Sequence, residues 1–381
     1  MKILMVSMPC LHFFRWAEQL QDSGHEIYWF DVTDGGKKVK RIHWVNQIVG
    51  WKFRWNYPGR TFIKINFPRL YDFIQRFNER DIKKIFERHL LEIQPEVVHS
   101  FALYISCTPI LQVMNKNQNI KWIYSSWGSD LYDLQNHSKY LIDIQNVLKR
   151  VDYLFTDCIR DYKIAQQHGF ENDFLGVLPG GGGYHLSEME AKIKAKEIRS
   201  TILIKGFQGK WGRAINVLKA LEGIKDKLNL YTIVVFGADN KVVSFCENSE
   251  LSKWMNFSVL CRVTQDEVFN LMAKSFLLIG NSVSDGMPNT MLEAMCMKVF
   301  PIQSNPGGVT QELIKDGFNG FLIEDTEDVE GISQIILRAL NDSELIKKGI
   351  VHNSLNIIPN LDYDIVKKKV LQSYLSVLQD N

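Results

Sequence analysis

Residues 275–295 read SFLLIGNSVSDGMPNTMLEAM. The first eight of them, residues 275–282, are apolar enough for a strand that is covered on both faces. Pro288 suits the first position of a helix, because its missing N–H has no partner to lose there. We therefore expect a buried strand, a loop that contains Asp285, and a helix over residues 289–297. A strand followed by a helix is the repeating unit of parallel α/β folds.

The start of this helix is a candidate phosphate site. N–H groups in a first helical turn have no carbonyl partner within the helix, and the helix dipole adds positive charge there. We place Gly286, Asn289 and Thr290 beside such a phosphate. Asp285 precedes the helix. Glu293 lies five residues past Pro288, which is about 7 Å further along the helix axis. Both carboxylates would accept hydrogen bonds from sugar hydroxyls. The alternative is a solvated loop aspartate and a surface glutamate.

The same alternation of short apolar runs and helical patterns covers the whole chain. Four glycines in VLPGGGGY, near residue 180, interrupt it and mark a boundary. We expect an α/β protein of two doubly wound, Rossmann-like domains facing a cleft, over residues 1–185 and 186–360, and a C-terminal helix over 361–381 that packs on the first domain. The expected strands are KILMVS, EIYWFDV, EVVHSF, KWIYSS, DYLFTD and FLGVL, then TILIKG, YTIVVFG, FSVLC, SFLLIG and VFPIQ.

A second strand-to-helix turn carries glycines and cations. It reads ILIKGFQGKWGRAINVLKAL, with glycines at Gly206, Gly209 and Gly212. Lys210 and Arg213 would supply positive charge to a diphosphate, arginine as a planar fork and lysine as a point charge. The alternative is a pair of exposed helix charges. A third glycine-rich turn, NPGGVTQEL, is expected to serve backbone packing beside the same site.

Composition constrains the protein's surroundings less than its motifs do. The 45 Lys and Arg residues nearly balance the 43 Asp and Glu residues, so total charge argues neither for nor against nucleic acid. The six cysteines form no CxxC pair and no zinc spacing. We expect reduced thiols in a cytoplasmic protein, no bound metal and no cofactor. The N-terminal apolar run, broken by Pro9, is expected to be a buried strand and not a secretion signal.

The motifs occur in an order that resembles the C-terminal domain of GT-B, family-4 retaining glycosyltransferases. The order runs from KGFQGKWGRA through FGAD, CRVTQDEV and SDGMPNTMLEAM to NPGGVTQELIKDGFNGFLI. The first half is similar more loosely: EVVHSF looks like the family's strand ending in His, SSWGSDLY like its His-Gly-x-Asp turn, and VLPGGGGY like the Pro-Asn-Gly entry to the second domain.

This resemblance implies a nucleotide-sugar donor held by the second domain, an acceptor held by the first, retention at the anomeric carbon and no metal. Asp285 and Glu293 match the family's Glu-x7-Glu pair, in which the first acid contacts the donor sugar and the second the ribose. Lys210 and Arg213 would be the basic residues on the diphosphate. We expect the reaction to depend on stabilising negative charge on the leaving diphosphate; covalent and front-face mechanisms both stay open.

Further residues are carried over by the same resemblance. Arg262 and Val263 would lie beside the base. His99 would lie near the cleft as a candidate catalytic residue, unless it is only a core histidine whose hydrogen bonds are satisfied. Gly128 and Asp130 would lie on the acceptor side, unless Asp130 only caps the segment that follows it. The chain departs from the family at three positions: Asp285 replaces a Glu, Phe207 stands where Arg is common, and Trp127 stands where His is common.

Residues 37–69 contain nine Lys or Arg residues, no Asp or Glu, and seven aromatic residues other than His. This composition suits an anionic membrane surface, single-stranded nucleic acid, an anionic lipid-linked acceptor, or an ordinary packed loop. We favour an anionic membrane surface at the inner face of the cell membrane, with a glycan or lipid-linked acceptor and no nucleic acid. A nucleotide-sugar epimerase and a non-catalytic nucleotide-sugar-binding protein are the competing hypotheses.

Overall fold

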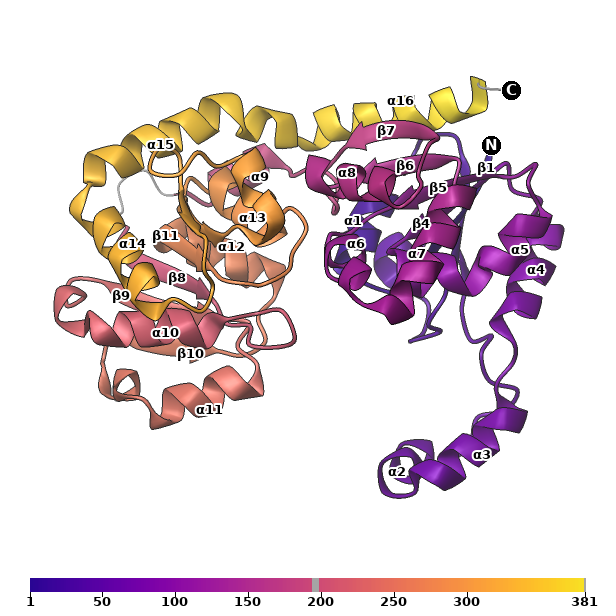
Figure 1. The fold of residues 1–381 in the computed structure, drawn as a ribbon, viewed down its shortest axis with the longest axis horizontal. Coiled ribbons are helices and arrows are strands. Elements are labelled where there is room, and N and C mark those ends of the chain that lie inside the picture. Colours follow the sequence, from indigo (N-terminus) through magenta and orange to yellow (C-terminus); the bar gives the residue numbers. More distant parts are fainter. Residues whose placement is uncertain (194–198, 380–381) are drawn as a thin grey trace. The chain divides into compact units, whose positions relative to one another are not determined.

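The computed structural model describes residues 1–193 and 199–379, and these form two compact units. Unit 1 comprises residues 1–157, 161–182 and 369–379, and unit 2 comprises the remaining described residues. The chain therefore passes into unit 2 at Gly183, three residues before the boundary expected from the sequence. Each unit is a parallel sheet with helices on both faces (Figure 1).

Unit 1 contains a sheet of seven parallel strands in the order β3-β2-β1-β4-β5-β6-β7. Six of these strands were predicted from their apolar runs. The seventh, β3, is a three-residue edge strand inside the basic segment and was missed. The bounds are β1 (Lys2–Ser7), β2 (Glu26–Asp31), β3 (Asn46–Ile48), β4 (Val97–Phe101), β5 (Lys121–Ser125), β6 (Tyr153–Thr156) and β7 (Asp173–Val177).

Successive side chains of each strand point to opposite faces of this sheet. Leu4 and Val6 belong to a core shared with α4, α5 and α7. The opposite face is covered by α1 and by residues 369–379 of α16, where Trp16 and Tyr374 are buried and hydrogen-bonded. The helices are α1 (Leu11–Glu18), α2 (Arg60–Asn66), α3 (Pro68–Asn78), α4 (Ile82–Ile93), α5 (Leu111–Lys116), α6 (Ser129–Tyr132), α7 (Ser138–Arg150), α8 (Ile159–Gln167) and α16 (Tyr363–Gln379).

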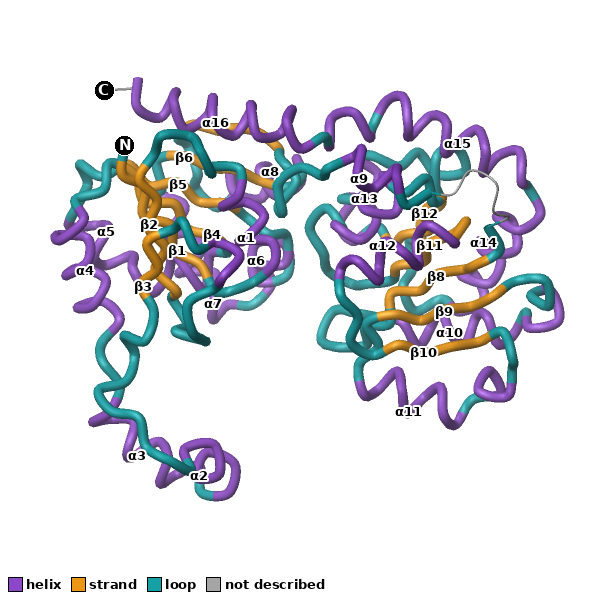
Figure 2. The backbone as a smooth tube through the Cα atoms, turned by 180° about the vertical axis from the view of Figure 1, so that it is seen from behind, coloured by secondary structure: helices purple, strands orange, loops and turns teal. Residues whose placement is uncertain are grey.

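Unit 2 contains six parallel strands in the order β10-β9-β8-β11-β12-β13. Figure 2 shows the first four in this order, with helices flanking them. Direction along the sheet reverses between β8 and β11, which makes their carboxyl ends the topological switch point, where ligands bind in such folds. The strands are β8 (Thr201–Lys205), β9 (Thr232–Phe236), β10 (Phe257–Leu260), β11 (Ser275–Gly280), β12 (Phe300–Ser304) and β13 (Phe321–Ile323). Only β13 was not predicted.

Two apolar layers cover the unit 2 sheet. One layer joins the strands to α10, α11 and α14, and the other joins them to α12 and α13. Both faces of the sheet are therefore buried under helices, as is usual for a parallel sheet. The helices are α9 (Leu186–Ala191), α10 (Ala214–Gly223), α11 (Asn240–Asn248), α12 (Gln265–Lys274), α13 (Asn289–Cys296), α14 (Val329–Asn341) and α15 (Ser343–Asn356).

The basic segment 37–69 divides into two parts. Its first part is folded into unit 1, where Ile42, Val45 and Trp51 are buried and the Trp51 indole donates to the Asp31 carbonyl oxygen at 2.8 Å. The first part therefore does not offer these apolar side chains to a membrane, because they are buried in the core of unit 1. The expectation that the whole of residues 37–69 faces a membrane is wrong for this part. The exposed part continues beyond residue 69 into α3. Within the described residues, no helix has both the length and the hydropathy to cross a bilayer.

Candidate functional site

The predicted strand, loop and helix are all present at the switch point of unit 2. β11 ends at Gly280 and α13 begins at Asn289. Pro288 lies one position earlier than expected: it is the N-cap residue, and its carbonyl oxygen accepts from the N–H groups of Met291 and Leu292. No side chain caps this end. The N–H groups of Asn289 and Thr290 have no acceptor within the helix, which is the geometry that favours a phosphate.

Asp285 lies in the loop before α13 and is held from two directions. Lys205, the last residue of β8, places its Nζ 3.8 Å from Asp285 Oδ2. Arg160 donates to the Asp285 carbonyl oxygen at 2.7 Å and to the Pro306 carbonyl oxygen at 2.6 Å. Arg160 is buried, so its guanidinium fixes the loop after β11 against the loop after β12. The sequence analysis missed both basic residues.

Glu293 lies on α13, facing the start of α12. It is buried, and its Oε1 accepts from Gln265 Nε2 at 3.0 Å. Gln265 is the first residue of α12. The start of this helix is stabilised by a capping box, in which the Thr264 and Glu267 side chains each bond to the other residue's backbone N–H. The structure thus brings Glu293 next to the end of the CRVT segment.

The two residues predicted in that segment differ in exposure. Arg262 is exposed, whereas Val263 is half-buried against the apolar layer of α12 and α13. Arg262 is therefore a surface cation near the α12 start, and Val263 contributes backbone and packing there.

The glycine-rich turn after β8 runs beside the Asp285 loop. The Arg213 N–H donates to the Asn281 carbonyl oxygen at 2.9 Å, and the Val283 N–H donates to the Trp211 carbonyl oxygen at 2.8 Å. The predicted basic turn and the predicted acidic loop are therefore adjacent. Packing alone explains the glycine at position 206. A Cβ there would lie 2.7 Å from Val235 Cγ1, so no larger residue fits, whether or not a ligand is bound.

The two cations predicted in this turn have other partners. Arg213 forms an ion pair with Glu327 and donates to the Gly212 carbonyl oxygen at 2.8 Å. Hydrogen bonds from Arg213 and then from Asn216 lower the pKa of Glu327. Lys210 holds its ammonium 4.8 Å from the Trp211 ring centroid. Arg213 is thus already neutralised within the chain, which corrects its assignment as a cation facing a diphosphate; Lys205 is the cation beside Asp285.

His99, expected near the cleft, is a core residue of unit 1. Its side chain is fully buried, with Nδ1 2.5 Å from the Tyr374 hydroxyl and Nε2 2.7 Å from Ser125 Oγ. Burial lowers the pKa of His99 well below its usual value, so the imidazole is neutral at pH 7. Both ring nitrogens are occupied and no surface is exposed. The catalytic assignment of His99 is therefore corrected: it links β4 and β5 to α16.

Asp130, expected on the acceptor side, is also occupied within unit 1. Its carboxylate accepts from the Leu103 N–H at 2.7 Å, the Tyr124 hydroxyl at 2.6 Å and the Trp127 N–H at 3.0 Å. Burial raises the pKa of Asp130, although these hydrogen bonds act in the opposite direction. Gly128 has a φ of 73°, which favours glycine. Both residues shape the turn, but Asp130 lies inside the first turn of α6 and accepts from residues that precede it, so it does not cap the segment that follows.

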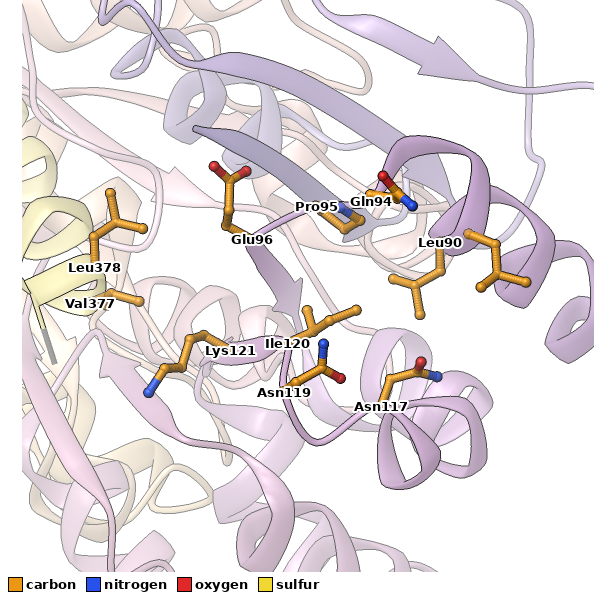
Figure 3. A pocket seen from close by; sticks show the side chains of 11 residues that line it. Leu90, Gln94, Pro95, Glu96, Asn117, Asn119, Ile120, Lys121, Val377 and Leu378 are labelled. Atoms are coloured by element: carbon orange, nitrogen blue, oxygen red, sulfur yellow. The ribbon is translucent and has the colours of Figure 1, made fainter. Parts of the chain in front are cut away.

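A pocket of about 450 Å³ in unit 1 lies away from the strand ends that bind ligands (Figure 3). It opens at the amino ends of β4 and β5, between Glu96, Lys121 and the end of α16, whereas ligands of parallel sheets bind at the carboxyl ends. We therefore place no substrate there. Its lining residues include Leu90, Gln94, Pro95, Asn117, Asn119, Ile120, Val377 and Leu378.

Two family models match the chain. Residues 180–350 match the family described as Glycosyl transferases group 1, and residues 2–158 match Glycosyl transferase 4-like. Among curated proteins, no match was found.

Several solved structures share the fold across the full length. A glycosyltransferase from Rickettsia africae ESF-5 is 17% identical, with a TM-score of 0.70, over 100% of this chain and 99% of that one. Sucrose-phosphate synthase from Thermosynechococcus elongatus is 11% identical, with a TM-score of 0.71, over 100% of both chains. Anabaena HepE in complex with UDP-glucose is 13% identical, with a TM-score of 0.70, over 99% of this chain and 100% of that one. These likenesses show the fold.

Proposed function

Because the chain is a group 1 glycosyltransferase with a GT-B fold, we propose that it transfers a hexose from a UDP- or GDP-sugar to an acceptor hydroxyl, with retention at the anomeric carbon. The observation that carries the proposal is the α13 N-terminus at the switch point of unit 2, with Asp285 before it and Glu293 along it. Anabaena HepE, which shares the fold, was solved with UDP-glucose, with UDP, and with UDP and glucose.

We assign the donor as follows. The diphosphate lies against the first N–H groups of α13, at Asn289 and Thr290, with the Gly286 backbone beside it. Glu293 accepts hydrogen bonds from the ribose hydroxyls, and the nearby Gln265 amide keeps its carboxylate oriented. Asp285 faces the sugar. It is one methylene shorter than a glutamate, and its contact with Lys205 gives that lysine a place beside the sugar–phosphate bond.

The chemical step needs positive charge where negative charge develops. The bond between the anomeric carbon and the phosphate oxygen breaks through an oxocarbenium-like state. The acceptor oxygen bonds to the anomeric carbon on the same face, and its proton passes to the departing phosphate oxygen. Lys205, Lys210 and the α13 N–H groups would stabilise the leaving diphosphate, and such preplaced charge is usually the largest catalytic contribution. We propose that these groups suffice without a metal ion.

The acceptor is proposed to be a lipid-linked or cell-envelope glycan. Support comes from the basic and apolar surface of unit 1 and not from the donor site. A hydroxyl carried on a lipid stays at the bilayer, so the enzyme that modifies it has to work there.

The donor assignment is tested by binding. Thermal shifts of the full chain with UDP, GDP, ADP and their sugars identify the nucleotide, because a ligand that binds only the folded state raises its stability. Glu293→Ala is expected to weaken binding of that nucleotide by about 10- to 100-fold, since a hydrogen bond to a charged group contributes about 1.5–3 kcal/mol. Glu247→Ala, at an exposed site on α11, is the control.

Two results would refute the assignment. One is unchanged nucleotide affinity in a Glu293→Ala protein that folds normally. The other is a donor that is bound but never cleaved, which would favour a non-catalytic binding protein. The configuration of slowly hydrolysed donor, read by NMR, distinguishes retention from inversion, and interconversion of two nucleotide-sugars without release of sugar would identify an epimerase.

A further inference from the structure

Helices α2 and α3 of unit 1 carry an unusual amount of exposed apolar surface. We call residues 60–78, which contain both helices, the arm. Figure 1 shows the arm standing clear of the sheet and the other helices of unit 1. Its exposed side chains are Phe62 (62% exposed), Ile65 (72%), Phe67 (53%), Leu70 (50%), Phe73 (57%) and Phe77 (61%).

These apolar side chains lie on one connected surface. On α3, Leu70, Phe73 and Phe77 are spaced i, i+3 and i+7, which places them on one side of the helix. The Phe73 and Phe77 rings are 5.5 Å apart. Phe67 joins the two helices, and its ring lies 6.2 Å from that of Phe62 on α2. The exposed face of α3 therefore continues onto α2.

Two uncharged polar residues of α3 face inward, whereas its charged residues Arg69, Asp72 and Arg76 are exposed. Gln75 and Asn78 are buried, although most such residues are exposed. Gln75 Nε2 donates to the Tyr57 hydroxyl at 3.0 Å, and Asn78 Oδ1 accepts from the Trp55 N–H at 3.0 Å. These bonds attach the polar side of α3 to residues 54–57. The apolar side of the helix consequently faces solvent. Large exposed apolar patches on protein surfaces mark interaction sites.

The charges beside this face are almost all positive. Residues 52–78 contain one acidic residue, Asp72, and six basic residues: Lys52, Arg54, Arg60, Lys64, Arg69 and Arg76. Arg69 and Arg76 are seven residues apart on α3 and so lie in one row beside the apolar face. Two other partners fit less well. A second copy of the arm would bring like charges together. Single-stranded nucleic acid would find no surface for base stacking on the aliphatic side chains of Ile65 and Leu70. An anionic bilayer matches both the charge and the apolar side chains.

We propose that the arm is a monotopic membrane anchor that lowers the phenylalanine face of α2 and α3 into the interface of an anionic bilayer. Arg69 and Arg76 contact the lipid headgroups from the flank of α3. The anchor lies in residues 60–78, beyond most of the segment that composition alone indicated. It deepens the proposed function by naming the surface that brings the enzyme to a lipid-linked acceptor, and lipid binding itself does not depend on the donor chemistry.

The test is flotation of the full chain with vesicles, without any sugar or nucleotide. Vesicles of phosphatidylcholine mixed with an equal amount of phosphatidylglycerol are expected to bind the protein, and pure phosphatidylcholine vesicles far less. Arg69→Gln with Arg76→Gln is expected to weaken binding by about 30-fold, because each basic residue near such a surface contributes about fivefold. Lys37→Gln with Lys38→Gln, exposed but outside the arm, should leave it nearly unchanged.

The apolar face is tested separately. Phe73→Ser with Phe77→Ser is expected to reduce vesicle binding by at least about tenfold, since two buried aromatic contacts are lost. Leu91→Gln with Ile142→Gln removes side chains of similar exposure elsewhere in unit 1 and serves as the matched control. Both double variants should keep the circular dichroism of the wild type, because the changed side chains point into solvent.

Three results would overturn the proposal: equal binding to neutral and anionic vesicles, unchanged binding in the Phe73/Phe77 variant, or loss of binding in the Leu91/Ile142 control. The proposal would also be overturned if the wild type forms a dimer in lipid-free solution and the Phe73/Phe77 variant is a monomer. That result would mean that the apolar face binds a second copy of the chain. Donor hydrolysis by the soluble protein should be the same in wild type and arm variants. Failure of the anchor and failure of the proposed reaction are thereby distinguished.

Discussion

Replacing Tyr374 by phenylalanine would remove one hydroxyl from the centre of unit 1. That oxygen lies 2.5 Å from His99 Nδ1 and accepts the Trp16 indole N–H at 3.4 Å. All three side chains are buried, and the other ring nitrogen of His99 is bonded to Ser125. The hydroxyl therefore connects α16 to the sheet and to α1 through two polar contacts that water does not reach.

The size of the effect follows from these contacts. A buried ring nitrogen left without a partner costs about 1–3 kcal/mol. The bond from Trp16 is long and adds little, because hydrogen bonds weaken beyond about 3.2 Å. We expect Tyr374→Phe to destabilise unit 1 by about 2 kcal/mol. In a unit of this size that corresponds to a melting temperature lower by about 4–8 °C.

Tryptophan fluorescence on heating measures this directly, since it reports mainly on unit 1. That unit contains seven of the nine tryptophans; only Trp211 and Trp254 lie in unit 2. Tyr104→Phe, at an exposed tyrosine of the same unit, is the matched control and should change the melting temperature little. If Tyr374→Phe melts with the wild type, the hydroxyl does not hold α16 in place and our account of this cluster is wrong.

The same cluster predicts how stability depends on pH. Burial lowers the pKa of His99 well below 6.5 in the folded protein, whereas the unfolded chain binds a proton near pH 6.5. As pH falls below 6.5, the unfolded state gains protons that the folded state does not, so stability decreases by at most about 1.4 kcal/mol per pH unit. His99→Gln removes this titration. Its melting temperature should approach that of the wild type as the pH falls to 5, and a constant difference would contradict the buried, neutral imidazole.

Two predictions concern the donor site. Lys205→Gln is expected to lower kcat by about 10-fold or more with a smaller change in nucleotide affinity, because a charge at the leaving phosphate acts mainly in the transition state; Lys241→Gln on α11 is the control, and an unchanged kcat would remove Lys205 from the mechanism. Arg160→Gln leaves the carbonyl oxygens of Asp285 and Pro306 without their charged donor. It should lower kcat, whereas Arg160→Lys should restore part of it; two variants equally active with the wild type would show that these loops need no such support.

The fold was predictable because its signal is local. Runs such as residues 2–7 and 275–280 are short, apolar and bounded by turn residues. The first was predicted with the bounds that the structure has, and the second was expected over residues 275–282 but ends two residues earlier, at Gly280. The two missed strands, β3 and β13, have three residues each and lie at sheet edges. A polar run such as NQI becomes a strand only because a neighbouring strand offers it hydrogen bonds.

The site was predictable only where its parts are close in sequence. Asp285, Glu293 and the α13 start lie within one strand–loop–helix unit, so spacing placed them on the loop and the helix where the structure has them; their roles toward a ligand stay predictions. Arg160 reaches Asp285 across 125 residues, and Glu327 reaches Arg213 across 114. No local pattern predicts such partners. A weak signal did exist for Lys205: it is a charged residue at the very end of an apolar central strand.

His99 and Asp130 show a different limit of the sequence. Their likeness to family motifs indicated a site, but a strand's side chains alternate between faces. Val98 points into the core shared with α4, and the neighbouring His99 consequently points toward α16. Motif likeness fixed the position of each residue along the chain. It did not fix what covers the residue once the helices have packed.

Two ion pairs order the cations around the proposed donor site of unit 2. Lys205 lies beside Asp285, and Arg213 beside Glu327. Pairs as exposed as these contribute only about 0–1 kcal/mol to stability, so their value to the fold is small. We expect the pair with Asp285 to hold the flexible Lys205 side chain in place, so that less freedom is lost when a charged ligand binds. Arg213 is held by Glu327 and is not assigned to the ligand.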